Sequence, residues 1–263
     1  MFFRTIMPLH SGIRGKMENC LTHGDKEMRR IVLMVLRLFY IAPYYVYRIW
    51  RFGRDDSTSY EEAFAYIKKV TKRANRAGRV IIESHGEENL PQKDGYIFFP
   101  NHQGLFDGLV FLESSPRPFT YITKKEARNV FLLKQVGDAL GVIAIDREDI
   151  RQSMQVINQV AEEVKNGKNF LIFPEGTRSR KGNQLLEFKG GSFKSATKAK
   201  CPIVPCALVD SFKPFDEKSI KKVTVKLTYL PPMYYEEYKG MKTHEIAEEV
   251  KRRIEAEIAR QLQ

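Results

Sequence analysis

Cysteine is scarce in this sequence, with only Cys20, Cys201 and Cys206 among 263 residues. An odd number of cysteines without a paired spacing excludes a disulfide framework, and no His and Cys spacing suggests a zinc site. Cys201 and Cys206 flank the short apolar stretch "PIVP". We therefore expect buried thiols in a reducing compartment, with no redox or metal role.

Acidic residues are also few, since 32 Asp and Glu stand against 44 Lys and Arg, giving a net charge of +12. Residues 1–54 carry much of this excess, with ten basic side chains and three acidic ones. A basic surface indicates an acidic partner: a nucleic acid, an anionic membrane surface, or an acidic carrier or substrate. No nucleic-acid-binding fingerprint accompanies the charge, so a nucleic acid is not expected as the partner.

An uninterrupted apolar run is missing, although residues 31–50 come close to one. Their length alone allows a membrane span, but Arg37, Pro43 and Arg48 interrupt them, and a central Arg costs roughly 2.5–3.5 kcal/mol on insertion. On a helical wheel Arg30, Arg37 and Arg48 form one stripe, with aromatic residues close by. This pattern favours a helix lying in the lipid headgroup layer, bent at Pro43. A core helix with surface-reaching arginines and a true span remain the alternatives.

Strands and helices alternate through the rest of the chain, with no internal repeat and no low-complexity linker. We expect strands within 79–84, 96–100, 117–123, 142–146, 169–173, 202–209 and 221–230. Helices are expected over 60–77 with Ser57 or Ser59 as the cap, after Gly104, in short pieces around 126–140, after Asp149 and over 192–200. The last helix has Thr243 as its candidate N-cap and places Ile246, Val250, Ile254, Ile258 and Leu262 at four-residue steps. This alternation predicts an α/β fold with a mixed, partly parallel sheet flanked by helices. We divide the chain into an N-terminal membrane-associated helical element, 1–55, and a catalytic domain, 56–263.

The stretch "PNHQGLFD" places His102 and Asp107 five residues apart where a strand gives way to a helix. At a helix start this spacing lets the carboxylate fold back onto the imidazole. An Asp bonded to one ring nitrogen leaves the other free to accept a proton, which makes the His a general base. The alternative is a capped helix start in which the Asp merely satisfies a structural His.

A nucleophile of the protein's own is absent, because no G-x-S-x-G turn occurs in the sequence. A base without such a nucleophile suggests that the substrate supplies the reacting hydroxyl group.

A second polar loop, "FPEGTRSR" at residues 173–180, follows the apolar strand "NFLIF". Its Gly176 permits close backbone approach, and Arg178 offers a planar fork that matches phosphate oxygens. Arg147, Lys189 and Lys194 in neighbouring loops add positive charge. The loop is therefore a candidate phosphate site, or else a polar turn with an exposed Arg. Because sites form at the carboxyl ends of strands, both loops and "IDRED" are expected at one edge of the sheet.

Taken together and in order, these segments resemble the glycerolipid acyltransferase family, in particular its bacterial lysophosphatidic acid acyltransferases. The resemblance covers roughly residues 80–210 and rests on "NHQGLFD", "YITKKEARN", "GVIAIDR", "FPEGTRSR" and "KGGSFKSATKAKCPIVPCAL". One departure is Gly104, where many members carry Ser, and it puts little in doubt.

The resemblance implies transfer of an acyl chain from acyl-carrier protein or acyl-CoA to the sn-2 hydroxyl of 1-acyl-glycerol-3-phosphate, making phosphatidic acid for phospholipid biosynthesis. It implies His102 as the base, Asp107 as the residue that holds the imidazole, and Lys124 near the oxyanion, with Lys125 as the alternate. The residues implied to bind the substrate are Asn101, Arg147, Glu175, Gly176, Thr177 and Arg178. No metal and no other cofactor is implied, and the enzyme is expected on the cytoplasmic face of the cell membrane, peripheral or monotopic.

Three other hypotheses stay open at this point: transfer to a different acceptor, a non-catalytic basic module that binds an anionic surface, and a hydrolase on the same fold. Acyl-chain length, the preferred donor, the oligomeric state and the natural start codon do not follow from the sequence.

Overall fold

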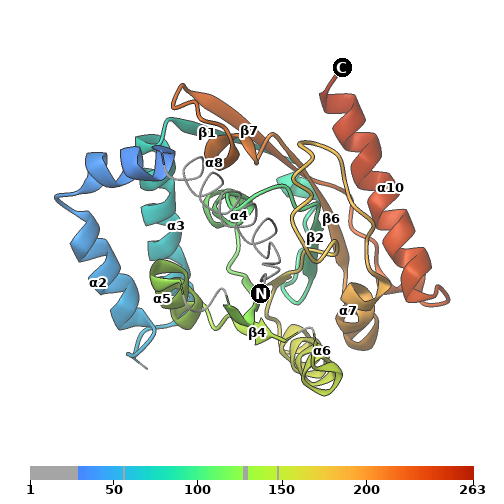
Figure 1. The fold of residues 1–263 in the computed structure, drawn as a ribbon. Coiled ribbons are helices and arrows are strands. Elements are labelled where there is room, and N and C mark those ends of the chain that lie inside the picture. Colours follow the sequence, from blue (N-terminus) through green and yellow to red (C-terminus); the bar gives the residue numbers. More distant parts are fainter. Residues whose placement is uncertain (1–28, 56, 127–129, 147) are drawn as a thin grey trace, which may run out of the picture.

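A seven-stranded sheet organises the chain in this computed structural model, which describes residues 29–55, 57–126, 130–146 and 148–263 (Figure 1). The spatial strand order is β1-β7-β6-β2-β5-β3-β4. The strands are β1 Val80–His85, β2 Ile97–Pro100, β3 Thr120–Lys124, β4 Ile143–Ile145, β5 Phe170–Leu171, β6 Ile203–Val209 and β7 Val223–Tyr229. Each of the seven segments expected to hold a strand overlaps one, and β1 and β3 each extend one residue beyond the expected bounds.

The sheet is mixed and mostly parallel, as predicted. Antiparallel pairing joins β6 to β7, and the other neighbouring pairs run parallel. Strands β6, β2, β5, β3 and β4 therefore point the same way, and their carboxyl ends meet at one edge of the sheet. Strands β1 and β7 point the opposite way.

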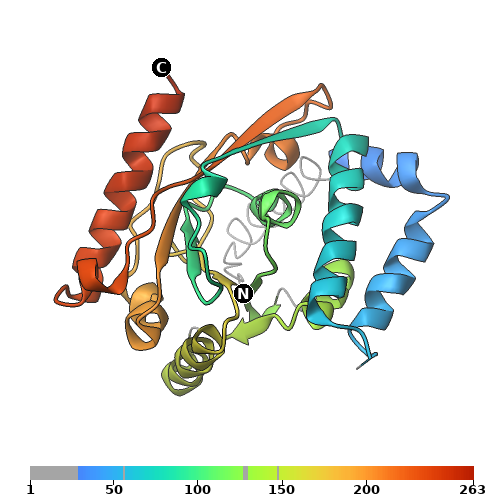
Figure 2. The ribbon, with the colours of Figure 1, turned by 180° about the vertical axis from the view of Figure 1, so that it is seen from behind.

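Helices cover both faces of this sheet, which Figures 1 and 2 show from opposite sides. One face carries α3 Tyr60–Ala77 and α4 Asp107–Ser114, and the other carries α6 Ile150–Lys165, α7 Lys194–Ala199 and α10 Thr243–Gln261. Shorter or peripheral elements are the helices α2 Ala42–Phe52, α5 Phe131–Ala139, α8 Lys213–Asp216 and α9 Tyr235–Tyr238, and the 3-10 turns Glu87–Asn89 and Gly190–Phe193.

Strand β2 lies in the middle of the core, and this position explains why its sequence is apolar throughout. Ile97 and Phe99 pack with α6, α7 and α10, whereas Phe98 faces α3 and α4, and all three side chains are fully buried. A parallel strand covered on both faces needs this continuous apolar run. The central position fixes the point from which the next residues, Asn101 and His102, leave the sheet.

Helix starts follow the local capping chemistry of the sequence. Ser59 accepts a hydrogen bond from Glu62 N, and the Glu62 side chain accepts one from Ser59 N, which forms a capping box for α3. Asp149 caps α6 by accepting hydrogen bonds from Arg151 N and Gln152 N, without a capping box. Helix α10 begins at Thr243, one residue after its N-cap Lys242, so the expected Thr243 cap is wrong by one position.

The N-terminal helices place only part of their arginine stripe against the rest of the protein. A bend of 96° separates the helix Arg29–Leu38 from α2, which begins next to Pro43 as expected. The three stripe arginines contact the protein: Arg30 is 2% exposed, Arg37 donates to Ala77 O, and Arg48 lies over the Tyr66 ring. The exposed large side chains here are apolar or aromatic: Val32, Val35, Leu36, Phe39, Tyr40, Tyr44, Tyr47 and Trp50. Arg30 is buried and Arg48 is half-buried, but Arg37 is exposed, so the stripe turns only partly to the protein, and the placement of these helices in a headgroup layer stays a prediction.

Within the described residues, no one helix has the length and apolar content to cross a membrane. The bent pair Arg29–Leu38 and α2 reaches that threshold only when its two helices are counted together, on length and composition.

Candidate active site

Strand β2 delivers His102 to the carboxyl edge of the sheet, at the start of α4. Asn101 extends the strand pairing with its side chain, because its amide both donates to Leu208 O and accepts from Leu208 N of β6. His102 Nδ1 then lies 2.8 Å from Asp107 Oδ2. The ring is 22% exposed, while the Asp107 side chain is fully buried. The predicted pairing of the two residues is confirmed.

Asp107 is held by backbone as well as by the imidazole. The amide of Gln103 donates to its Oδ2 at 2.6 Å, and the amide of Gly104 donates to both oxygens. A buried carboxylate needs such donors to offset the loss of water. The loop between His102 and Asp107 thus surrounds the carboxylate of Asp107, and Nδ1 of His102 is hydrogen-bonded to that carboxylate. Nε2, on the opposite side of the ring, makes no hydrogen bond to any residue that the structure describes.

The loop after β5 meets His102 directly, although about seventy residues separate them in sequence. The His102 ring stacks on Phe173 with centroids 4.1 Å apart. The amide of Ser179 donates to His102 O at 2.8 Å, and the amide of His102 donates to Glu175 Oε1 at 2.7 Å. The sequence-based expectation that these two loops share one edge is confirmed, and Arg178 stands next to a residue bonded to His102.

Glu175 braces the His102 loop, which means that it holds the backbone of His102 by hydrogen bonding, and both of its carboxylate oxygens take part in backbone hydrogen bonds. Oε1 accepts from His102 N and Oε2 from Leu186 N, and the residue is 1% exposed. Burial raises the pKa of this carboxyl above its usual value, and the two backbone hydrogen bonds partly oppose that effect. In this structure Glu175 joins three loop segments, and its binding of substrate stays a prediction.

The other predicted substrate-binding residues of the loop differ in exposure. Thr177 is exposed, Arg178 is partly buried, and Gly176 adopts a φ of 72°, a left-handed conformation that favours glycine. Lys124 ends β3 at the same edge and is exposed, as is Lys125 after it. Arg147 lies outside the described residues. The roles of all these residues stay predictions.

Sequence reasoning missed two residues that the structure places beside Asp107. Ser211 Oγ lies 2.5 Å from Asp107 Oδ1, and Ser211 N donates to the side-chain oxygen of Gln103. Both Ser211 and Gln103 are buried. A signal was present, because "DS" is a polar pair after the apolar strand β6, at the edge where the other loops were sought.

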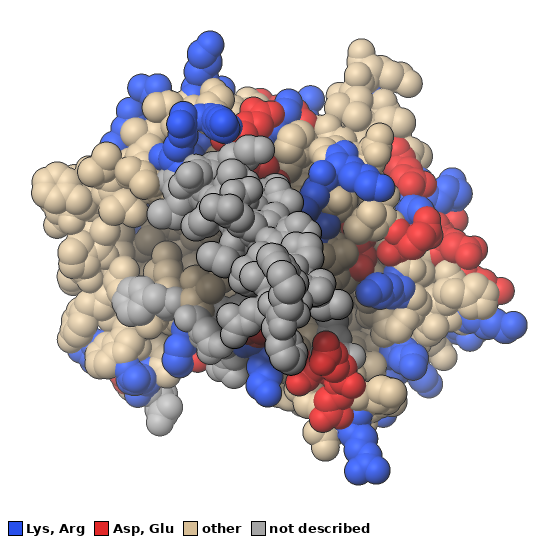
Figure 3. Space-filling model, in the orientation of Figure 1, with Lys and Arg blue, Asp and Glu red and all other residues tan. Residues whose placement is uncertain are grey.

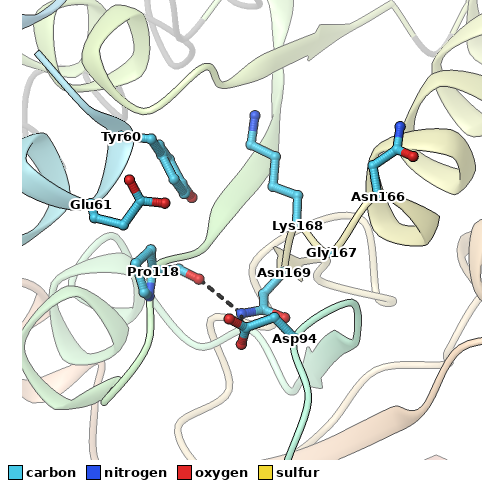
Figure 4. A pocket seen from close by; sticks show the side chains of 8 residues that line it. All are labelled: Tyr60, Glu61, Asp94, Pro118, Asn166, Gly167, Lys168 and Asn169. Atoms are coloured by element: carbon cyan, nitrogen blue, oxygen red, sulfur yellow. Dashed lines mark hydrogen bonds between the residues drawn. The ribbon is translucent and has the colours of Figure 1, made fainter.

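A cavity lies at the edge of the sheet opposite His102 and is lined mainly by polar side chains (Figure 4). Its volume is about 220 Å³, and Asp94, Pro118 and Asn169 in its lining precede β2, β3 and β5. These parallel strands separate it from His102, so it is not part of the candidate active site. Among the described residues, no group of three or more His, Cys, Asp or Glu side chains is arranged to hold a metal ion.

The two cysteines within the described residues are free, buried thiols. Burial raises the pKa of Cys201 to about 12 and that of Cys206 well above its ordinary value, which disfavours the reactive thiolate form. The predicted burial of these two thiols is confirmed, the absence of a redox or metal role stays a prediction, and Cys20 lies outside the described residues.

Comparison with known proteins gives one consistent result. Residues 81–209 match the acyltransferase family. The 1-acyl-sn-glycerol-3-phosphate acyltransferase of Borreliella burgdorferi is 33% identical over 135 residues, which are 51% of this chain and 53% of that protein. The protein of the same name from Helicobacter pylori is 33% identical over 148 residues, 52% of this chain and 62% of that protein. The human 1-acyl-sn-glycerol-3-phosphate acyltransferase alpha is 31% identical over 164 residues, 59% of this chain and 55% of that protein.

A solved structure supports the fold independently. The crystal structure of PlsC, the 1-acyl-sn-glycerophosphate acyltransferase of Thermotoga maritima, superimposes with a TM-score of 0.71 at 23% identity, covering 89% of this chain and 97% of that one. The chain spans about half to three fifths of the length of the curated relatives it matches. The matched segment, 81–209, contains both the His102–Asp107 pair and the loop that contacts it. Over this segment, about half of its length, the chain is therefore similar to members of the acyltransferase family.

Proposed function

We propose that the chain transfers a fatty acyl group from a thioester to the sn-2 hydroxyl of 1-acyl-sn-glycerol-3-phosphate and so makes phosphatidic acid. The observation that carries this proposal is the His102–Asp107 pair at 2.8 Å, held against a loop with an arginine and a glycine. The names of the relatives support the choice of acceptor. The donor is an acyl-carrier protein or acyl-CoA, both acidic and both suited to a basic protein.

The chemistry follows from which ring nitrogen is engaged. With Nδ1 bonded to Asp107, Nε2 takes the proton from the acceptor hydroxyl as its oxygen attacks the thioester carbonyl. The tetrahedral intermediate then expels the thiolate, which recovers the proton from the His102 imidazolium. The products are the ester and a free thiol, and no acyl-enzyme forms.

Positive side chains supply the remaining roles in this proposal. Lys124, or Lys125 as the alternate, stabilises the negative charge on the thioester oxygen, because fixed donors aimed at a developing charge lower the barrier. Arg178 and the backbone around Gly176 and Thr177 hold the acceptor's phosphate, since a guanidinium fork matches two phosphate oxygens. Arg147, Asn101 and Glu175 complete the proposed binding residues.

The membrane placement is part of the proposal and rests on the exposed apolar and aromatic side chains of the N-terminal helices. Their arginines contact the protein while Leu36 and Phe39 are 65% and 68% exposed. In Figure 3 the side of the molecule formed by α2 is largely uncharged, whereas charges of both signs gather on the α10 side. An exposed aromatic and aliphatic face of this kind suits insertion into the lipid interface. We propose docking on the anionic, cytoplasmic face of the membrane, where the lysolipid acceptor resides.

The test is an assay of the purified protein with lysophosphatidate and one acyl thioester, scored for phosphatidate and free thiol. Replacing His102 with Ala should lower turnover by about 10²- to 10⁴-fold, the usual contribution of a general base. The matched control is His85→Ala, because His85 is exposed at the end of β1, which points away from the site edge.

Each alternative predicts a different result in this assay. Free fatty acid without any acceptor indicates a hydrolase, and a panel of lysolipids with larger headgroups identifies another acceptor. Turnover by His102→Ala at the wild-type rate sinks the catalytic assignment, and no turnover in either form leaves a binding module.

A further inference from the structure

A serine far along the chain completes the hydrogen bonding of the Asp107 carboxylate. Ser211 Oγ donates to Asp107 Oδ1 at 2.5 Å, across a separation of 104 residues. Both side chains are fully buried. His102 and Gln103 N occupy Oδ2, so Ser211 is the side-chain donor on the other oxygen.

The position of Ser211 is itself fixed by a buried amide. Gln103 accepts from Ser211 N at 2.9 Å through Oε1 and donates through Nε2 to Leu208 O and Asn183 Oδ1, each at 2.9 Å. Asn183 in turn pairs with Asp210 by two hydrogen bonds. Every polar atom of the Gln103 side chain therefore has a partner, and the turn after β6 is locked to the loop that carries His102.

An arginine on the N-terminal helix holds the segment that follows. Arg30 donates from Nε to Pro214 O at 2.8 Å and from Nη2 to Ser219 O at 2.7 Å and Lys221 O at 3.1 Å. Its Nη1 donates to Gly78 O. A buried guanidinium that caps several carbonyl groups restrains them strongly, because removing it leaves those groups unsatisfied.

Contact between the two loops is also tight at the backbone. A Cβ added at Gly104 would lie 3.2 Å from the Cα of Phe212, the residue after Ser211. The loop of His102 and the turn of Ser211 therefore pack against each other without an intervening side chain at this point. A shift of the Ser211 turn is passed on to the Asp107 carboxylate.

We propose that Ser211 is a positioning residue for His102, acting through Asp107, and that Arg30 secures it from the side of the N-terminal helices. The catalytic part of this inference rests on the proposed acyl transfer. With the hydroxyl in place, Oδ1 is anchored and Oδ2 stays directed at Nδ1. Without the hydroxyl, the carboxylate can rotate away from Nδ1, and turnover falls. The carboxylate also loses a hydrogen-bond donor to its charge, so it attracts the imidazolium form of His102 more strongly.

The experiment compares Ser211→Ala with the matched control Ser115→Ala in the full chain. Ser115 is also fully buried and its Oγ donates one short hydrogen bond, to Arg117 O, but it lies at the opposite end of α4. Ser211→Ala removes the Oγ contacts to Asp107 Oδ1 and Gln103 Oε1, and Ser115→Ala removes the one to Arg117 O, so a loss of thermal stability is expected in both variants. Glu175 and Asp107, the carboxylates beside the ring, are unchanged in both.

Two readouts separate positioning from stability. In Ser211→Ala we expect kcat to fall roughly tenfold, as the loss of one hydrogen bond to a charged group allows, with KM for both substrates within about twofold. The NMR titration of labelled His102, assigned with a His102→Gln variant, should move to higher pH. Ser211→Thr, which keeps the hydroxyl, should restore both quantities, and Ser115→Ala should change neither.

The outcomes distinguish this inference from the proposed function. If wild-type turnover depends on His102 but Ser211→Ala leaves kcat and the His102 titration unchanged, the positioning role is wrong and the acyl transfer stands. If the wild type shows no turnover, the proposed function is wrong, and the titration still decides whether Ser211 controls the His102–Asp107 pair. An equal loss of kcat in both serine variants, without a shift in titration, reduces Ser211 to a structural residue.

Discussion

At the scale of single residues, the site depends on carboxylates that face inward and not toward solvent. Asp107 and Glu175 are each at most 1% exposed, and backbone amides hydrogen-bond to both. Acidic residues in polar loops are mostly exposed to solvent. Here one orients an imidazole and the other fixes the backbone of the same histidine.

Replacing Glu175 with Gln tests this second role. A glutamine can accept from only one of the two amides and turns an N–H group toward the other, so one buried donor loses its partner. We expect unfolding free energy to fall by about 1–3 kcal/mol and turnover to fall as His102 loses its brace. Urea unfolding together with the acyl-transfer assay measures both.

Glu187→Gln is the control for that experiment. Glu187 follows in the same loop but is 87% exposed and pairs with Lys251 at the surface. Its loss should change stability by less than about 1 kcal/mol. Equal effects of the two substitutions would contradict the bracing role of Glu175.

Among the elements, helix α10 combines a buried apolar face with a charged outer face. Its inner residues Ile246, Val250, Ile254 and Ile258 are buried at four-residue steps, as predicted from the sequence. On the outer face, Glu249 accepts two hydrogen bonds from Arg252 and one from Arg253. The hydrogen bonds from Arg252, together with the weaker contribution of Arg253, lower the pKa of this carboxyl to about 2.

This shift predicts a defined loss of stability in acid. Because the pKa of Glu249 is lower in the folded protein than in the unfolded chain, its contribution is fully present above the ordinary pKa of about 4.5 and lost as pH falls toward about 2. We expect Glu249→Gln to remove that contribution, on the order of 1 kcal/mol for a partly exposed pair. Unfolding free energies of both proteins, measured by denaturant titration between these pH values, should converge at the acid end.

The neighbouring substitution Glu248→Gln serves as the comparison, since Glu248 is exposed on the same helix. A pH-dependent difference that is as large for Glu248→Gln as for Glu249→Gln would show that net charge, and not the arginine pairing, is responsible.

Considered as a whole, the molecule has a largely uncharged side formed by α2 and a charged side formed by α10 (Figure 3). Figures 1 and 2 place α2 and α10 at opposite ends of the sheet. The bent pair of helices turns aliphatic and aromatic side chains outward, while Arg30 is buried against the protein. In water such a face is costly, which is why a lipid surface is the proposed partner.

The double variant Leu36→Glu, Phe39→Glu tests this placement. Both side chains are more than 60% exposed, so the change leaves the core intact, and we expect co-sedimentation with anionic phospholipid vesicles to fall at least tenfold. Each buried leucine-sized or phenylalanine-sized side chain contributes roughly 1.5–3 kcal/mol to lipid binding. Leu262→Glu, which alters an exposed leucine at the end of α10, should bind vesicles like the wild type. Unchanged vesicle binding by the double variant would exclude this face as the docking surface.

Much of the fold and the centre of the site follow from local sequence patterns. The strand segments, the helix caps at Ser59 and Asp149, and the closeness of His102 to Asp107 depend on residues within a few positions of one another. A spacing of five at a helix start leaves few geometries, so the chain itself brings the two side chains together. The family resemblance, carried by short motifs in order, rests on the same local information.

Tertiary structure alone decided the partners that arrive from a distance. Ser211 meets Asp107 across 104 residues, Glu175 meets His102 across 73, and Arg30 meets Pro214 across 184. No periodicity or spacing specifies such contacts, because they depend on which strands become neighbours in the sheet. The arginines of the N-terminal helices show the same limit. Their common stripe was visible in the sequence, but only the packing against α3 and the 212–221 segment determined that Arg30 is buried while Arg37 stays exposed.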